Sequence, residues 1–183
     1  MSLCLVANWK LNGSKEFNHQ WVLEFLRNFN GNNFSILGIA PASLYIDHLQ
    51  TTLTDYDIKI GSQNIDLEET GARTGEISAS MINDLGCAFS IIGHSERRML
   101  FHETNQMICH KLIQADNNSV IPILCIGESA KENLSNNTFN VLEQQIIEAL
   151  ENANELSSLI IAYEPVWAIG SGKTPNPEEI NSV

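Results

Sequence analysis

A chain of 183 residues with 43% hydrophobic and 17% charged side chains can bury the core of one domain, and this composition excludes a disordered polypeptide. The net charge of −12 argues against nucleic acid or an anionic membrane as a partner, because both favour a basic surface. A small anionic substrate is compatible with this charge, since a few amides and one lysine can override the overall sign locally.

The four cysteines, Cys4, Cys87, Cys109 and Cys125, form no C-x-x-C pair, which argues against a zinc knuckle or a disulfide scaffold. We therefore expect reduced thiols and a cytoplasmic protein. The N-terminus "MSLCLVANWK" lacks the basic region of a signal peptide. No apolar run approaches the ~20 residues that a membrane span requires.

Short apolar runs predict β-strands at residues 3–8, 34–40, 58–65, 89–94, 120–127 and 158–166. They recur about every 30 residues, which is the length of one strand–helix–strand unit. Each run is nearly continuous in apolar residues, as is typical of parallel strands that are covered on both faces.

Helical patterns separate these runs. Four aromatic residues recur at every fourth position behind Ser14 and predict an amphipathic helix; they are Phe17, Trp21, Phe25 and Phe29. Further helices are expected before Gly86, over residues 142–150, and after Asn176.

The alternation of strands and helices predicts an α/β fold. It favours either a doubly wound sheet or a (β/α)₈ barrel of which about six βα units are present. Periodicity alone leaves both architectures open. No linker or low-complexity segment divides the chain, so we expect a single domain over residues 1–183.

Polar side chains gather where the apolar runs end. Functional sites of parallel α/β folds form at the carboxyl ends of strands, so the set is informative although each residue alone has an ordinary explanation. The set consists of Asn8, Lys10, Gln63, Asn64, His94, Glu96, Glu128 and Glu164.

Two members of this set have surroundings that suggest chemistry. His94 in "GHSERR" stands at the mouth of a predicted helix capped by Ser95, where backbone amides and the helix dipole favour a neutral imidazole donor. Glu164 stands between Tyr163 and the apolar segment 165–167, so we expect desolvation to make its carboxylate a stronger base. By default, Arg97 and Arg98 are expected to be exposed bases.

The segment "AIGSGKT" has the composition of a phosphate-binding loop. Gly170 and Gly172 are too close together for the G-x-x-x-x-G-K-[ST] pattern, so a nucleotide loop is disfavoured. A hinged lid whose amides meet a phosphate fits the segment better.

Taken together, these motifs resemble the triosephosphate isomerase family over nearly the whole chain. The motifs are "ANWKLNG" at 7–13, "GSQNID" at 61–66, "GARTGEIS" at 71–78, "IIGHSERR" at 91–98, "PILCIGE" at 122–128 and "AYEPVWAIGSGKTP" at 162–175. Six motifs in family order make the resemblance specific.

The resemblance implies a TIM barrel and an isomerase of triose phosphates that needs neither a metal nor an organic cofactor. It implies that Glu164 is the base that moves a proton between adjacent substrate carbons, and that neutral His94 polarises the carbonyl. By the same resemblance, Lys10 stabilises the enediolate and binds the phosphate, Asn8 orients oxygen, and Glu96 supports Lys10.

The resemblance also implies a lid and a homodimer. The lid includes Pro165, Val166, Trp167, Lys173 and Thr174, and the Gly170 amide meets the substrate phosphate. The loop that docks into a partner near its Asn8 and His94 contains Thr70, Gly71, Arg73, Thr74, Gly75 and Glu76. Arg73 stands where family members commonly carry an aromatic residue, which puts the packing of that interface in question.

The sequence stops at Val183, in the helix after the sixth strand. A barrel of the family has eight strands, so we expect the C-terminal units and their phosphate loops to be missing, and strands one and six to have exposed apolar edges. The alternative is a catalytically inactive truncated barrel that acts only in binding or assembly. Another sugar-phosphate barrel enzyme is disfavoured by "GHSERR" together with "YEPVWAIGSGKT".

Overall fold

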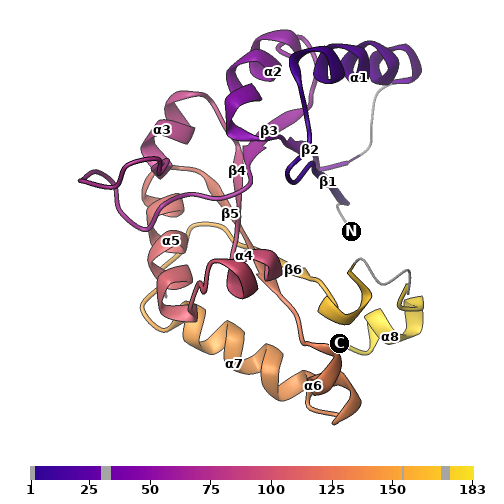
Figure 1. Ribbon diagram of the computed structural model, residues 1–183, viewed down its shortest axis with the longest axis vertical. Coiled ribbons are helices and arrows are strands. Elements are labelled where there is room, and N and C mark those ends of the chain that lie inside the picture. The colour runs from indigo at the N-terminus through magenta and orange to yellow at the C-terminus, as the bar shows by residue number, and fades with distance from the viewer. Residues whose placement is uncertain (1–2, 30–33, 154, 170–173) are drawn as a thin grey trace.

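The computed structural model describes residues 3–29, 34–153, 155–169 and 174–183. Across these ranges parallel strands alternate with helices (Figure 1). The strands are β1 (Cys4–Asn8), β2 (Ile36–Ala40), β3 (Lys59–Ser62), β4 (Phe89–Ile92), β5 (Ile121–Ile126) and β6 (Ile160–Tyr163). The helices are α1 (Lys15–Asn28), η1 (Ser43–Tyr45), α2 (Ile46–Thr52), α3 (Ala79–Asp84), α4 (Ser95–Leu100), α5 (Asn105–Asn117), α6 (Ala130–Leu134), α7 (Thr138–Leu150), η2 (Val166–Ala168) and α8 (Pro177–Asn181).

The strands lie side by side in chain order. The sheet runs β1-β2-β3-β4-β5-β6 through the described residues, and every neighbouring pair is parallel. A doubly wound sheet reverses its strand order at a switch point, and this sheet does not. The fold is therefore a curled part of a TIM barrel, which confirms the barrel and rejects the doubly wound alternative (Figure 1).

All the predicted strands are present, but β3 is shorter than the predicted run at 58–65. Beyond Ser62 the ladder gives way to side-chain hydrogen bonds. Gln63 Nε2 donates to the carbonyl oxygens of Ala40 and Lys10, both at 2.9 Å. The end of β3 is thus set by a polar side chain that turns toward the first two strands.

The predicted helix boundaries rest on side-chain caps. Ser14 Oγ accepts from the Phe17 amide at 3.0 Å, and the Asn176 and Glu179 side chains form a reciprocal capping box at α8. Gly86, just after α3, has φ of 74°, a left-handed conformation that glycine adopts without strain. These caps confirm the helices predicted at both ends of the chain and before Gly86.

Successive residues of a strand point to opposite faces, so the sheet supports two apolar layers. The outer layer packs the helices against the sheet and includes Ile60, Ile92 and Leu124. The inner layer is centred on Phe89, which is fully buried. A Cβ at Gly61 would lie 2.3 Å from the Phe89 ring, so glycine is required there for the ring to fit.

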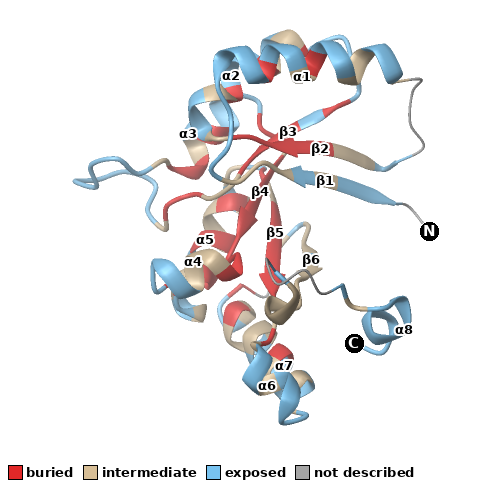
Figure 2. Cartoon of the chain, turned by 45° about the vertical axis from the view of Figure 1, so that its right-hand side comes forward, coloured by how far each residue is buried: buried red, intermediate tan, exposed pale blue. Residues whose placement is uncertain are grey.

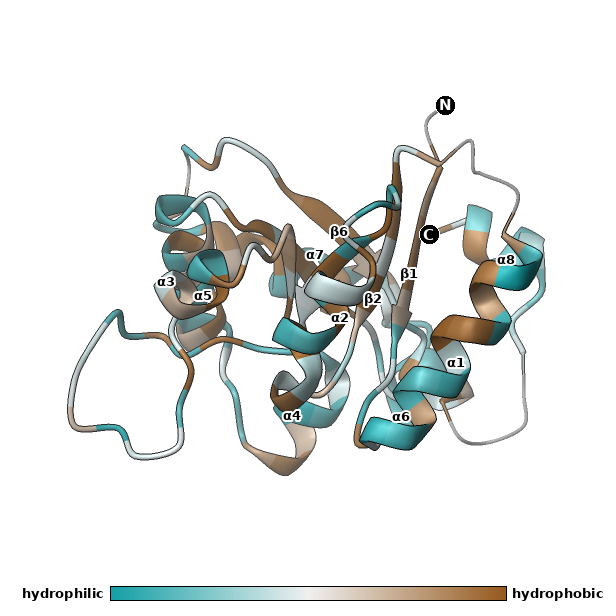
Figure 3. Cartoon of the chain, turned by 90° about the horizontal axis from the view of Figure 1, so that it is seen from above, coloured by the Kyte–Doolittle hydropathy of each residue, from teal (hydrophilic) through white to brown (hydrophobic). Residues whose placement is uncertain are grey.

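Burial decreases from the centre of the sheet to its edges. Most residues of β3, β4 and β5 are buried, whereas β1 is largely exposed and β6 is half-buried or exposed (Figure 2). The edge strands remain apolar in composition (Figure 3), and Leu5 and Ile161 are 51% and 47% exposed. In the described ranges, no helix combines the length and apolarity needed to cross a membrane.

Candidate functional site

A cavity of about 460 Å³ opens on the inner side of the sheet between β1 and β6. Asn8 and Lys10 line it from the end of β1, His94 from the end of β4, and Glu164 from the end of β6. Apolar side chains of β1, β4, β5 and β6 form the rest of its wall. The structure therefore brings four of the predicted catalytic residues together.

Lys10 has an unusual backbone conformation. Its φ of 52° lies in the left-handed region, which a non-glycine residue occupies only when its surroundings enforce it. Asn8 Oδ1 accepts from the Lys10 amide at 2.9 Å, and Gln63 Nε2 donates to the Lys10 carbonyl at 2.9 Å. The ammonium Nζ lies 2.8 Å from Glu96 Oε1. Asn8, Gln63 and Glu96 thus fix both ends of this lysine.

His94 and Glu164 are in direct contact. His94 Nε2 lies 3.1 Å from Glu164 Oε2, and Glu164 Oε1 accepts from the Ser95 amide at 2.6 Å. The two side chains are only 11% and 17% exposed. The sequence neighbours of Glu164 predict an apolar setting, but the described structure gives both of its carboxylate oxygens polar partners.

The ring of His94 caps α4. The Glu96 amide donates to His94 Nδ1 at 3.2 Å, so Nδ1 accepts and the proton of a neutral ring lies on Nε2, facing Glu164. The predicted cap at Ser95 is wrong by one residue, because Ser95 is already the first residue of the helix and its buried hydroxyl has no hydrogen-bond partner among the described residues. Nδ1 also lies 3.5 Å from Glu96 Oε2, so the neutral histidine remains a prediction from the helix terminus.

The backbone at Glu164 lies very close to the end of β5. The Glu164 amide donates to the Ile126 carbonyl at 2.8 Å, which continues the β5–β6 ladder. A Cβ at Gly127 would lie 1.9 Å from the Glu164 carbonyl oxygen, a distance that no side chain tolerates. Glycine at position 127 therefore allows the candidate base to approach the end of β5.

The first part of the predicted lid is tied to Glu128, which is fully buried. Glu128 Oε1 accepts from Trp167 Nε1 at 2.7 Å, both carboxylate oxygens contact the Tyr163 hydroxyl, and the Val166 amide donates to the Glu128 carbonyl. Burial, with the nearby Glu128 charge, raises the pKa of Tyr163 to about 12. Pro165 precedes η2, and Thr174 is exposed. The predicted lid residues Gly170 and Lys173 lie outside the described residues.

The predicted docking loop projects away from the sheet between β3 and α3 (Figures 1 and 3). All of its predicted residues are exposed; they are Thr70, Gly71, Arg73, Thr74, Gly75 and Glu76. Arg73 Nε lies 2.7 Å from Asp66 Oδ1, so this departure from the family pattern forms an ion pair at the base of the loop. Burial alone would raise the pKa of Asp66, but hydrogen bonds from Arg73 and from the Glu68 amide outweigh it and lower the pKa.

The thiols and bases also differ from one another in burial. Cys87, Cys109 and Cys125 are buried free thiols, and Cys4 is exposed. Burial raises the pKa of Cys125, which lines the cavity, to about 12.

The prediction that Arg97 and Arg98 are exposed bases is wrong, because both are half-buried. Arg98 donates to the carbonyls of Gly93 and Cys125 at the ends of β4 and β5, and nothing in its local sequence signals these contacts.

Comparison with known proteins adds a second, independent set of observations. The family model described as Triosephosphate isomerase matches residues 3–183. A triosephosphate isomerase of Nitrosococcus oceani is 40% identical over 181 residues, which cover 98% of this chain and 72% of that protein. One from Blochmanniella floridana is 42% identical over 188 residues, and they cover 100% and 72% of the two chains. One from Escherichia coli O1:K1 is 39% identical over 181 residues, with 98% and 71% covered.

Proposed function

The chain belongs to the triosephosphate isomerase family, and from this premise we propose that residues 1–183 form one TIM-barrel domain whose cavity holds the reacting groups. The reaction is the interconversion of dihydroxyacetone phosphate and D-glyceraldehyde 3-phosphate, an isomerisation. The observation that carries the assignment of the site is the contact of 3.1 Å between His94 Nε2 and Glu164 Oε2 in a cavity that Lys10 also lines.

Glu164 is the base in this proposal. Its carboxylate removes a proton from one substrate carbon and returns it to the adjacent carbon, so one group performs both transfers. His94 Nε2–H hydrogen-bonds the carbonyl oxygen and stabilises the negative charge that develops there. In the described structure the two groups contact each other, and the substrate would enter between them and replace that contact.

Lys10 provides the positive charge. Its ammonium, 2.8 Å from Glu96, stabilises the enediolate and the substrate phosphate. Asn8 contributes by accepting from the Lys10 amide, which keeps the lysine in its left-handed conformation, and by orienting oxygen in the cavity. The positive charge of the site is thus confined to Lys10, which stands with the carboxylates of Glu96 and Glu164 in a chain whose net charge is −12.

The lid role follows from the family. Segment 165–174 closes over the substrate, with the Gly170 amide meeting the phosphate, and water is excluded from the enediolate. The hydrogen bond from Trp167 Nε1 to the buried Glu128 anchors the first residues of this segment. Neither a metal nor an organic cofactor enters these steps.

We also propose a cytoplasmic homodimer. Large apolar side chains are exposed after β1, after β2 and at the end of α4; they include Leu11 at 99%, Leu44 at 87%, Leu100 at 70% and Phe101 at 60%. Exposed apolar surface of this kind marks interfaces between proteins. In this proposal the docking loop 70–76 enters a partner near that subunit's cavity.

The direct test of the base is the substitution Glu164→Asp, assayed by coupled detection of glyceraldehyde 3-phosphate formation. Shortening the side chain by one methylene withdraws the carboxylate by about 1 Å, and misplacement of this size costs about 10²-fold in turnover. Circular dichroism and thermal melting should show an unchanged fold, because aspartate keeps the charge and shortens the side chain by only one methylene.

The matched control is Glu143→Asp, an exposed glutamate on α7 outside the cavity, which should retain the parent rate. If Glu164→Asp turned over substrate at the rate of the parent protein, the assignment of Glu164 as the base would be wrong. If the parent protein had no isomerase activity, the alternative of a barrel that acts only in binding or assembly would be favoured. Conversion of larger sugar phosphates in place of trioses would contradict the substrate assignment.

A further inference from the structure

Arg98 joins the ends of two strands at the cavity. It lies on α4, and its Nε donates to the Gly93 carbonyl at 2.7 Å while its Nη2 donates to the Cys125 carbonyl at 3.2 Å. Gly93 follows the last residue of β4, and Cys125 is the second-last residue of β5. A single guanidinium therefore bridges the carboxyl ends of neighbouring strands.

These two strand ends position the candidate catalytic pair. Gly93 directly precedes His94, and Cys125 pairs in the sheet with Ala162, two residues before Glu164. The separation of the two bridged carbonyls thus governs the separation of His94 from Glu164. Gly93 has φ of 70°, and a Cβ there would lie 2.7 Å from Ile108 Cδ1, so the turn before His94 leaves little room for rearrangement.

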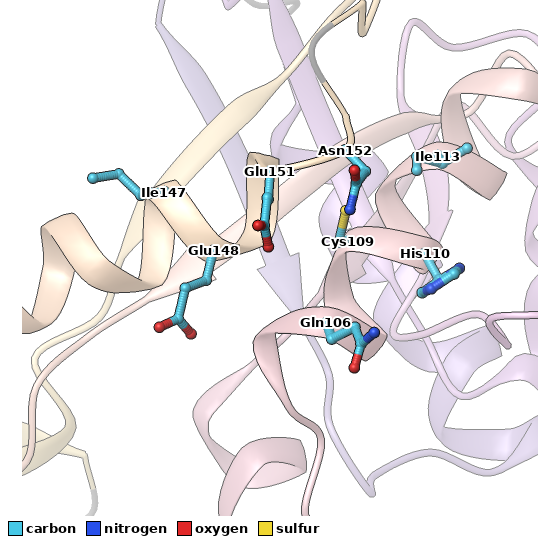
Figure 4. Close-up of a pocket in the computed structure, with 8 residues that line it drawn as sticks. All are labelled: Gln106, Cys109, His110, Ile113, Ile147, Glu148, Glu151 and Asn152. Atoms are coloured by element: carbon cyan, nitrogen blue, oxygen red, sulfur yellow. The ribbon is translucent and has the colours of Figure 1, made fainter.

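Arg98 is itself held by two further side chains. Its Nη1 donates to Asn105 Oδ1 at 2.5 Å, and Asn105 Nδ2 donates to Glu148 Oε2 at 2.7 Å. Glu148 lies on α7 at the edge of a groove of about 700 Å³ between α5 and α7, on the side facing Gln106 (Figure 4). Hydrogen bonds from Asn105 and Gln144 lower the pKa of Glu148, so its carboxylate is an acceptor at neutral pH.

The neighbouring arginine shows that this role is specific to Arg98. Arg97 Nε contacts Glu103 Oε1, and its guanidinium carbon lies 4.5 Å from the centre of the Phe101 ring. Burial lowers the pKa of Arg98, a cost that its hydrogen bonds to the backbone offset. Only the planar fork of arginine reaches three acceptors in different directions, so lysine is no substitute.

We propose that Arg98 is a positioning residue for the isomerase reaction, held by Asn105 and Glu148, which sets the distance between His94 and Glu164. This inference rests on the proposed function of the cavity. It assigns to Arg98 no contact with the substrate. Its effect on the reaction is exerted through the carbonyls of Gly93 and Cys125.

The first experiment replaces Arg98 in the intact protein. Arg98→Lys should lower kcat about tenfold or more while KM changes less than about threefold, because the groups that bind the substrate remain in place and their alignment does not. For Arg98→Ala, millimolar guanidinium should restore part of the lost kcat. The ¹⁵N NMR signals of the His94 ring should shift in both variants, and they report the His94–Glu164 contact whether or not the protein is active.

A second, milder variant keeps the test decisive if Arg98 variants lose their fold. Glu148→Gln weakens the hold on Asn105 and should lower kcat about threefold, with the His94 ring signals shifted in the same direction. Glu143→Gln on the same helix is the matched control, because Glu143 is exposed and the described hydrogen bonds of the Asn105 side chain go to Arg98 and Glu148; it should leave kcat and the His94 signals unchanged.

Unaltered His94 signals and kcat in Arg98→Lys would overturn the proposal, as would a Glu148→Gln variant that matches Glu143→Gln. Lack of rescue by guanidinium in a folded Arg98→Ala protein would contradict it too. Failure of the proposed function has a different signature, namely a parent protein that is inactive although its His94 signals respond to Arg98→Lys.

Discussion

The centre of the sheet and its two edges contribute different parts of the candidate site. His94 comes from the end of β4, whose residues are all buried. Lys10 and Glu164 come from the ends of β1 and β6, the strands that hydrogen-bond one neighbour within the described residues. The three groups thus combine one side chain from a packed interior with two from exposed edges.

The centre and the edges of the sheet are ordered by different forces. Apolar burial fixes the centre, at about 25 cal/mol for each Å² removed from water. The edges are held by individual polar side chains, with Gln63 on the Lys10 carbonyl and Glu128 on Trp167. Each such bond contributes about 1 kcal/mol, so the edge geometry rests on few contacts.

The largest expected effect is at the centre. Phe89→Ala removes a fully buried ring that fills the space above Gly61. We expect the free energy of unfolding to fall by about 4 kcal/mol, from lost transfer energy plus the cavity left behind. Urea unfolding followed by circular dichroism measures this change.

The matched substitution at the edge is Ile161→Ala on β6. Ile161 is 47% exposed, so its removal should lower the free energy of unfolding by only about 1 kcal/mol. Equal losses at Phe89 and Ile161 would show that the chain in solution covers β6 more fully than its described contacts do, and the contrast between centre and edge would fail.

Much of this architecture could be predicted because it depends on local patterns. Continuous apolar runs predict β1 to β6, and cap residues such as Ser14 and Asn176 predict where α1 and α8 begin. The clustering of polar residues at strand ends predicts the cavity, because parallel strands place those ends at one rim.

The remaining features depend on contacts between distant segments. The Glu164 carboxylate has polar partners on α4 that its own neighbours in sequence do not reveal. The cap at His94 in place of Ser95 depends on the rotation of one ring, and the bridging role of Arg98 depends on the separation of two strand ends. Composition and spacing carry no signal for such distances.

The smallest expected effect is at the base of the docking loop, which is more exposed than either edge strand. The Asp66–Arg73 pair lowers the pKa of Asp66 below the ~3.9 of an unfolded chain. Its stabilisation is complete above that value and is lost as the pH falls through the lower, folded pKa. In parallel melts from neutral pH to about pH 2.5, the melting temperature of the parent should fall by a few degrees more than that of Arg73→Ala, because the variant has no ion pair to lose.

Sedimentation equilibrium over the same pH range tests the dimer. Arg73→Ala should dissociate at a higher protein concentration than the parent does. Identical pH profiles for the two proteins would show that the pair does not anchor the loop, and a parent that sediments only at 20.3 kDa would contradict the homodimer.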